Sequence, residues 1–170
     1  MPTTTTSAPA LFSPEWAEAV RDAVDRGPSD ELRAEKLPTY WEWIDEVRAG
    51  YDDSWALVDP DLPAEFGGGP AHLLLQWERG RCTRAAIVGP EEAAGATYVL
   101  RATHEAWREL LDGADAGRML IYRRVRLERG DVLQFFRGVY FVVEALAALG
   151  RVPARLDEVG RLTDDRQAYQ

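Results

Sequence analysis

The stretch that decides the fold is Asp131-Val-Leu-Gln-Phe-Phe-Arg-Gly-Val-Tyr-Phe-Val-Val-Glu-Ala-Leu-Ala-Ala-Leu149. Fourteen of its 19 residues are apolar. Drawn as one helix at 100° per residue, it has a narrow polar stripe that includes Phe141, and the opposite face is centred on Val132, Phe136, Val139, Val143 and Leu146. One buried face needs an apolar arc of only about 100°. The wider arc found here requires a second cover, which is a core, a partner chain or a ligand.

The residues before this helix predict a mixture of strands and helices. Val125-Arg126-Leu127-Glu128 alternates as a strand does, and Gly130-Asp131 turns the chain into the closing helix. Thr103 and Asp115 are helix caps, each followed by apolar residues at helical spacing. Four apolar runs predict further strands, the middle two joined by a turn at residues 78–81: Trp55–Val58, Leu73–Trp77, Cys82–Val88 and Tyr98–Leu100.

The front of the chain predicts helices. Ser13-Pro14-Glu15-Trp16 combines a capping serine with proline in the first turn and an acid at the positive end of the helix dipole. Gly27-Pro28 ends that helix, and Ser29 caps the next helical region, which Pro38 interrupts. This region, Asp30–Gly50, is rich in aromatic residues.

Length and composition indicate one soluble globular domain. A chain of 170 residues can bury a core of its own, and we expect the domain at 11–150 between a tail at 1–10 and a polar tail at 151–170. We expect neither a secretory signal nor a stable membrane anchor, because the first ten residues lack a basic start and an apolar stretch, and no apolar run is long enough to span a bilayer. A single cysteine, Cys82, fits the reducing cytoplasm.

The charge is unevenly placed. The net charge of −9 argues against nucleic acid as a partner. Residues 1–66 hold 15 acidic and 5 basic residues, whereas the last third carries a cluster of arginines. Arginine is suited to phosphate recognition, and the alternative is that these arginines pair with the acidic front half. The cluster comprises Arg118, Arg123, Arg124, Arg126 and Arg129.

No residue pattern predicts a catalytic centre, a metal site or a cofactor. His72 opens a strand, and His104 at a helix start is expected to be a solvated surface residue. No spacing of Cys, His and acidic residues resembles a zinc site. Cys82 on a strand is expected to be buried, and Gly67-Gly68-Gly69 lacks the Lys-Ser/Thr of a phosphate loop. Adjacent acids at Glu91-Glu92 and Asp164-Asp165 are expected to be solvated.

Several strings, in this order and spacing, resemble the sterol carrier protein-2 family in its small stand-alone bacterial form. The clearest is Val125-Arg126-Leu127-Glu128-Arg129-Gly130-Asp131, a short strand and turn before the closing helix. The others are Phe12-Ser13-Pro14-Glu15-Trp16-Ala17, Arg81-Cys82-Thr83 and Glu105-Ala106-Trp107-Arg108-Glu109-Leu110-Leu111-Asp112-Gly113.

The resemblance implies an α+β fold with a five-stranded, mostly antiparallel sheet covered by helices. It also implies an apolar tunnel under the closing helix and a sterol, fatty acid or fatty acyl-CoA as ligand, with no reaction. Three features depart from the family, and one of them is Tyr122-Arg123-Arg124, which stands before the strand where smaller residues such as Gly-Lys are expected. The helical insert at 30–50 is long and aromatic, and the closing helix carries four aromatic residues, Phe135, Phe136, Tyr140 and Phe141, which could fill the tunnel.

We therefore expect non-catalytic binding of a lipid, fatty acyl or sterol-like ligand, which the protein could transfer or present. Arg123 and Arg124 are the candidates to hold its headgroup or phosphate. One alternative is a scaffold protein that forms a homodimer through its apolar helix. Another is an accessory enzyme for a lipid- or polyketide-like substrate that uses a carboxylate or Tyr122. The expected lining of the tunnel is Leu75, Trp77, Trp107, Leu111, Met119, Phe136, Val139, Tyr140 and Val143.

Overall fold

The structure is a computed structural model that describes residues 8–155. Most of the two expected tails, residues 1–7 and 156–170, lies outside the described residues. The ends of the described chain meet, because the Leu11 amide donates to the Arg155 carbonyl at 2.9 Å and the Arg155 amide donates to the Pro9 carbonyl at 2.8 Å.

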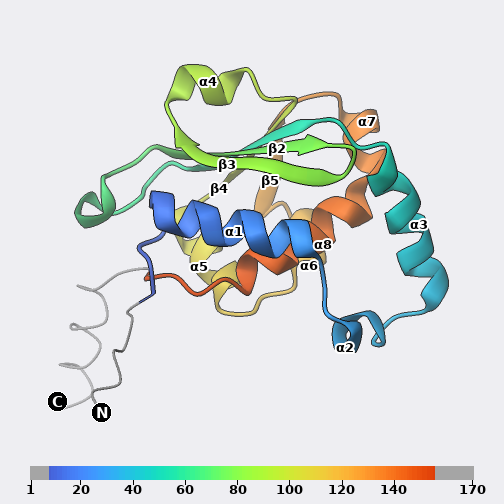
Figure 1. The fold of residues 1–170 in the computed structure, drawn as a ribbon. Helices are drawn as coiled ribbons and strands as arrows, with labels where there is room; N and C mark the ends of the chain where they lie inside the picture. The colour runs from blue at the N-terminus through green and yellow to red at the C-terminus, as the bar shows by residue number, and fades with distance from the viewer. Residues whose placement is uncertain (1–7, 156–170) are drawn as a thin grey trace, which may run out of the picture.

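The described residues form eight α-helices, one short 3-10 helix and five strands (Figure 1). The helices are α1 (Pro14–Arg26), α2 (Asp30–Arg33), α3 (Pro38–Ala49), η1 (Ala64–Phe66), α4 (Pro90–Ala94), α5 (His104–Leu111), α6 (Ala116–Ile121), α7 (Val132–Arg137) and α8 (Val139–Gly150). The strands are β1 (Ser54–Asp59), β2 (Ala71–Glu78), β3 (Arg81–Val88), β4 (Tyr98–Ala102) and β5 (Val125–Arg129). No helix in residues 8–155 has the length and apolar character needed to cross a membrane.

The five strands form one sheet in the order β3-β2-β1-β4-β5, which leaves β5 at an edge. Three of its pairings are antiparallel and β1 pairs with β4 in parallel, so the expected mostly antiparallel sheet is confirmed. The predicted caps are also present, since the side chains of Ser13, Thr103 and Asp115 accept hydrogen bonds from the first turns of α1, α5 and α6. A cap satisfies backbone amides that the helix itself leaves without partners.

The two faces of the sheet are covered differently. In β1, Trp55 and Leu57 belong to the main core, whereas Ala56 and Val58 belong to a small second cluster with Ala93 of α4. Figure 1 shows α4 on one side of the sheet, and α1, α5 and α8 on the other. The main core therefore lies between the sheet and α8, as alternation along a strand requires.

The closing stretch is two helices rather than one, which corrects the sequence prediction. Gly138 ends α7 and precedes α8 with non-helical angles of φ −108° and ψ 21°. Gly138 is buried, and a Cβ there would lie 3.3 Å from Tyr51 and 3.4 Å from Val47. A side chain at this position would require the Tyr51 and Val47 side chains to move by a few tenths of an ångström.

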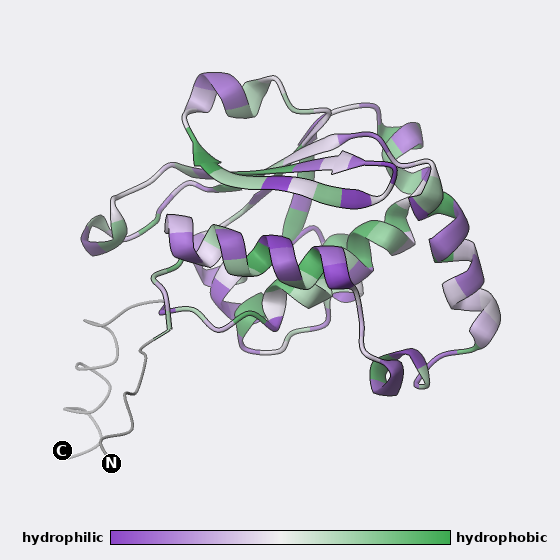
Figure 2. Ribbon diagram, in the orientation of Figure 1, coloured by the Kyte–Doolittle hydropathy of each residue, from purple (hydrophilic) through white to green (hydrophobic). Residues whose placement is uncertain are grey.

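The break changes which residues are buried. Phe141, expected in the polar stripe, is only 4% exposed, and its ring centroid lies 4.9 Å from those of Trp77 and Tyr51 and 5.7 Å from that of Trp55. Val132 and Phe136, expected at the centre of the buried face, are exposed. Figure 2 shows α8 as a strongly hydrophobic helix against the sheet. Its buried residues are Phe141, Val142, Ala145, Leu146, Ala148 and Leu149.

Phe141→Ala should destabilise the fold by about 3–5 kcal/mol, because a buried ring between two tryptophans is replaced by a cavity. The measurement is the free energy of unfolding in urea. The matched control is Phe136→Ala, which removes the same ring from an exposed position and should cost less than about 1 kcal/mol. Equal losses in the two variants would contradict this assignment of the core.

Candidate ligand-binding site

A pocket of about 760 Å³ opens beside the edge strand β5, between α6, α7 and α8. It is larger than four other pockets on the described residues, and its lining is mostly apolar. Its residues come from six parts of the chain: Lys36, Tyr40, Asp115, Gly117, Leu120, Ile121, Arg123, Val125, Arg126, Leu127, Val132, Phe135, Phe136, Val139, Tyr140 and Val143.

Four of the expected lining residues meet in this pocket, namely Phe136, Val139, Tyr140 and Val143. All four come from α7 and α8. The bend at Gly138 turns Phe141 toward the sheet and leaves Phe136 and Tyr140 on the outer side, where they are 52% and 44% exposed. The rings of Phe136 and Tyr140 therefore line an open pocket.

The other five expected lining residues lie elsewhere. Leu75 and Trp77 are buried in the core under Phe141. Trp107 is buried too and donates from Nε1 to the Val58 carbonyl at 2.9 Å. Met119 is buried on α6, and Leu111 packs against the core from α5. Beneath α8, the ring of Phe141 packs against Tyr51, Trp55 and Trp77, and the pocket lies toward β5.

The arginines divide into paired and unpaired groups. Arg124 does not line the pocket. Its Nε donates to Glu109 Oε2 at 3.1 Å. Arg123 and Arg126 do line it and form no ion pair with any described residue. Glu109 lies in α5, outside the acidic front half of the chain. None of these three arginines forms an ion pair with a described residue of that front half, which was the alternative to phosphate recognition. The pocket has two free cations at its β5 side.

A second polar group lies across the pocket, where the helical insert meets α8. The Tyr40 hydroxyl donates to Glu144 Oε2 at 2.6 Å, and Lys36 Nζ lies 2.8 Å from the same oxygen. Burial and the bond to Glu144 raise the pKa of Tyr40, so the hydroxyl keeps its proton at neutral pH. Glu144 neutralises Lys36, which leaves the cationic character of the pocket with Arg123 and Arg126.

The aromatic insert also forms a wall of the pocket. Tyr140 packs edge-on against Tyr40 at 5.6 Å and against Trp43 at 5.1 Å, measured between ring centroids. Sequence reasoning noted the aromatic character of residues 30–50 but did not connect them to the site. The signal that could have done so was the coincidence of two unusual features, extra aromatic residues in the insert and on the closing helix.

The sequence predicted Arg126 as part of the arginine cluster and Met119 of α6 as a lining residue, but it did not predict that Leu127 of β5 and Leu120 of α6 line the pocket. Their role depends on β5 being the sheet edge, and the order of strands in the sheet is not readable from the apolar pattern alone.

His104 is not the solvated residue expected from the sequence. Its Nδ1 lies 2.7 Å from Oδ2 of Asp59, and Asp59 is fully buried at the end of β1. A buried carboxylate needs a partner, and the start of α5 supplies it. Neither residue lines the pocket beside β5. Tyr122 is 70% exposed and makes no side-chain hydrogen bond to another described residue.

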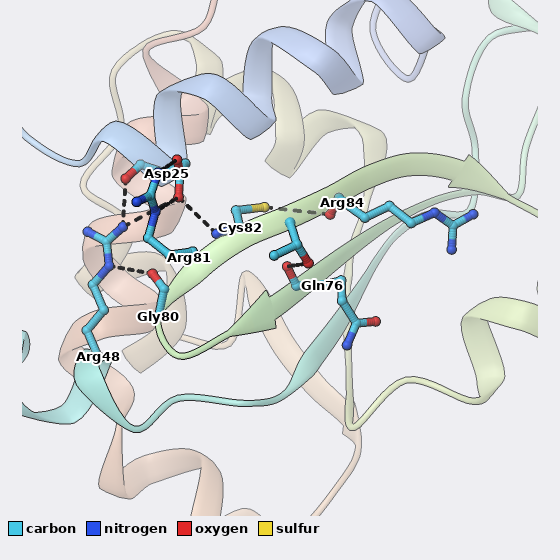
Figure 3. Close-up of polar contacts among 8 residues, drawn as sticks. Asp25, Arg48, Gln76, Gly80, Arg81, Cys82 and Arg84 are labelled. Carbon is cyan, nitrogen blue, oxygen red and sulfur yellow. Dashed lines mark hydrogen bonds and ion pairs between the residues drawn. The ribbon is translucent and has the colours of Figure 1, made fainter.

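Cys82 is buried beside a group of hydrogen bonds that connects α1, α3 and the β2–β3 turn (Figure 3). Arg81 donates two hydrogen bonds to Asp25, which lower the pKa of that carboxyl, and the Cys82 amide donates a third at 3.0 Å. Arg48 Nε donates to the Gly80 carbonyl at 2.6 Å. Gly80 has φ 76°, and a Cβ there would lie 2.2 Å from the Arg48 carbonyl oxygen, so the turn requires glycine.

Within residues 8–155, no group of three or more His, Cys, Asp or Glu side chains is placed to hold a metal ion. The described part of the site therefore offers an apolar lining, two free arginines and a neutralised Lys–Tyr–Glu group. These features suit binding of an amphiphilic molecule.

Two solved structures are similar to this chain along nearly their whole length. A crystal structure of sterol carrier protein 2 matches with a TM-score of 0.65 and 20% identity, over 84% of this chain and 99% of that one. A solution structure of a hypothetical protein from Thermus thermophilus, described as a possible sterol carrier protein, matches with a TM-score of 0.62 and 20% identity, over 88% and 94%. No family model and no curated protein sequence matches. The resemblance to sterol carrier protein 2 is thus confirmed as a shared fold.

The thiol of Cys82 should resist alkylation in the folded protein, because burial raises its pKa to about 12 and leaves it protonated at neutral pH. The measurement is the rate of iodoacetamide labelling at neutral pH, followed by mass spectrometry. Thr83→Cys supplies an exposed neighbouring thiol as the control and should be labelled first, and urea should release Cys82. Equal labelling rates for the two thiols in the folded protein would contradict the burial of Cys82.

Proposed function

We propose that the protein binds a lipid-type ligand, fatty acyl or sterol-like, in the pocket beside β5, and carries or presents it without a chemical reaction. The observation that supports this most is the pocket of about 760 Å³, lined by Val132, Phe136, Val139 and other apolar residues. Ligand pockets in proteins measure about 300–1,000 Å³ and are mostly apolar with a few polar groups.

The fold gives independent support, since both similar structures carry the name or the description of a sterol carrier protein. We also propose a cytoplasmic location, since a chain with one cysteine suits a reducing compartment. Neither observation identifies the ligand, so the chemistry of the ligand is inferred from the residues that line the pocket.

Burial of apolar surface would drive binding. Each methylene group removed from water contributes about 0.8 kcal/mol, so an acyl chain of about a dozen methylenes gains roughly 10 kcal/mol before association costs. Exposed rings at the pocket, such as Phe136 and Tyr140, would be covered by the ligand at the same time.

Arg123 and Arg126 favour a ligand with an anionic end. Both line the pocket and are free of ion pairs with described residues, whereas the sequence-based candidate Arg124 is held by Glu109. Guanidinium groups bind carboxylate and phosphate through paired hydrogen bonds. We infer that the acyl chain lies along α7 and α8, with its carboxylate or phosphate at the β5 side.

Native mass spectrometry of protein purified from cells tests the proposal, together with displacement of a fluorescent fatty acid. A bound lipid mass, and displacement, are expected. Val139→Trp, which fills the pocket, should weaken binding by at least about tenfold, since it excludes several methylene groups. Ala94→Trp is the control, because it places the same ring in a pocket on the other face of the sheet. An apo mass with no binding of the fatty acid would overturn the proposal.

Arg126→Gln should weaken binding of a fatty acyl-CoA by roughly tenfold, because a charge-assisted hydrogen bond is lost. Arg124→Gln removes the same charge outside the pocket and should leave the dissociation constant within about twofold. Isothermal titration calorimetry measures both. A larger loss in Arg124→Gln than in Arg126→Gln would contradict the assignment of the anionic end.

A further inference from the structure

The pocket is surrounded by apolar side chains that face solvent. Ile121 and Tyr122, where α6 leads to β5, are 75% and 70% exposed, and Leu133 on α7 is 77% exposed. Val132 and Phe136, which line the pocket, are exposed as well. We call these five residues the apolar rim. Leu37 and Trp43 are exposed too, but the five rim residues gather around one pocket, and a grouped exposed apolar patch of this kind marks an interaction surface.

The orientation of α7 is fixed, so its exposed apolar face is part of the fold. Phe135 is 1% exposed, and its ring packs against Tyr98 with 5.2 Å between centroids. Asp131 caps the helix by accepting from the Gln134 amide at 2.9 Å. With Phe135 held in the core, helical spacing directs Val132, Leu133 and Phe136 together to the outer side.

Arginines flank the apolar rim. Arg123 and Arg126 line the pocket, Arg118 precedes the rim on α6, and Arg137 ends α7. All four are exposed and make no ion pair with a described residue. The whole chain carries a net charge of −9, so these four arginines form a basic region on an otherwise acidic protein. Such a region would turn toward a negatively charged surface as the protein approaches it.

We propose that the apolar rim docks on the surface of an anionic lipid bilayer. Ile121, Tyr122 and Leu133 insert among the headgroups, while the flanking arginines bind lipid phosphates. Side chains that project from a turn and from one helix face, beside arginines, suit the shallow interface of a membrane. The pocket between these elements then opens onto the bilayer, so a lipid can pass between the two without crossing water.

The charges argue against a second copy of the chain as the occupant. Symmetric pairing of the rim with itself would bring the same surface together from both copies and place Arg123 and Arg126 close to their counterparts. Asp115 and Asp131 are held in place as helix caps, Glu144 binds Lys36, and none of these three carboxylates forms an ion pair with Arg123 or Arg126. An anionic surface of lipids supplies the missing negative charge.

Vesicle co-sedimentation of the ligand-free full chain tests this proposal separately from ligand binding. Binding is expected to vesicles of phosphatidylcholine with phosphatidylserine, and it should fall with salt and with removal of phosphatidylserine. Tyr122→Ser combined with Leu133→Ser should weaken binding at least about tenfold, since two inserted side chains are lost. Neither residue lines the pocket, so fatty acid binding should be unchanged.

Two double variants, one on the rim side and one as its control, test the role of the arginines. Arg118→Gln with Arg137→Gln should weaken vesicle binding roughly 25-fold, at about fivefold for each arginine near an anionic surface. Arg79→Gln with Arg151→Gln removes the same charge from exposed positions outside the rim and should have a much smaller effect. Thermal melting checks that all variants fold.

Absence of vesicle binding by the wild type at low salt, or full binding by the Tyr122→Ser, Leu133→Ser variant, would overturn the proposal. A stable dimer in sedimentation equilibrium that these two substitutions dissociate would also overturn it, in favour of a second copy. If vesicles bind and fatty acid does not, the docking surface stands and the proposed ligand site fails.

Discussion

The structure depends on where Phe141 packs. Its ring fills the space between Tyr51, Trp55 and Trp77, and it reaches that space because Gly138 interrupts the helix and packs closely against Tyr51. A continuous helix would have turned Phe141 toward its polar side. The same bend leaves Phe136 and Tyr140 outside the core. One buried ring therefore both closes the centre of the domain and determines that the open volume lies at the sheet edge.

The edge position gives the pocket its chemical character. Strand β5 has a neighbour on one side only, so its residues Val125 and Leu127 and the nearby α6 can line an opening. The arginines Arg123 and Arg126 stand there without acidic partners among the described residues. The opposite wall, where the insert meets α8, has its charges neutralised through Glu144. A pocket with an apolar lining and two arginines on one side is suited to amphiphiles. The proposed docking of the apolar rim would open this pocket onto the bilayer in which such molecules dissolve.

Much of the fold could be predicted from sequence because it follows from local rules. Strand alternation, the capping residues Ser13, Thr103 and Asp115, and the turn at Gly80 act over a few residues. The site could be predicted only in part. Phe136 and Tyr140 were found from the excess of apolar surface, but Arg126 and Tyr40 depend on which segments meet in space. The break at Gly138 was missed because glycine is tolerated within helices, and its close packing against Tyr51 and Val47 cannot be read from the sequence.

The most direct test of the central claim is methyl chemical-shift mapping by nuclear magnetic resonance while a fatty acid is added. The account predicts that the shifts concentrate on Val125, Val132, Val139 and Val143, which line the pocket, while those of Val58, Val88 and Val99 on the other face of the sheet stay in place. Shifts confined to that second set, or spread over the buried residues under Phe141, would contradict it.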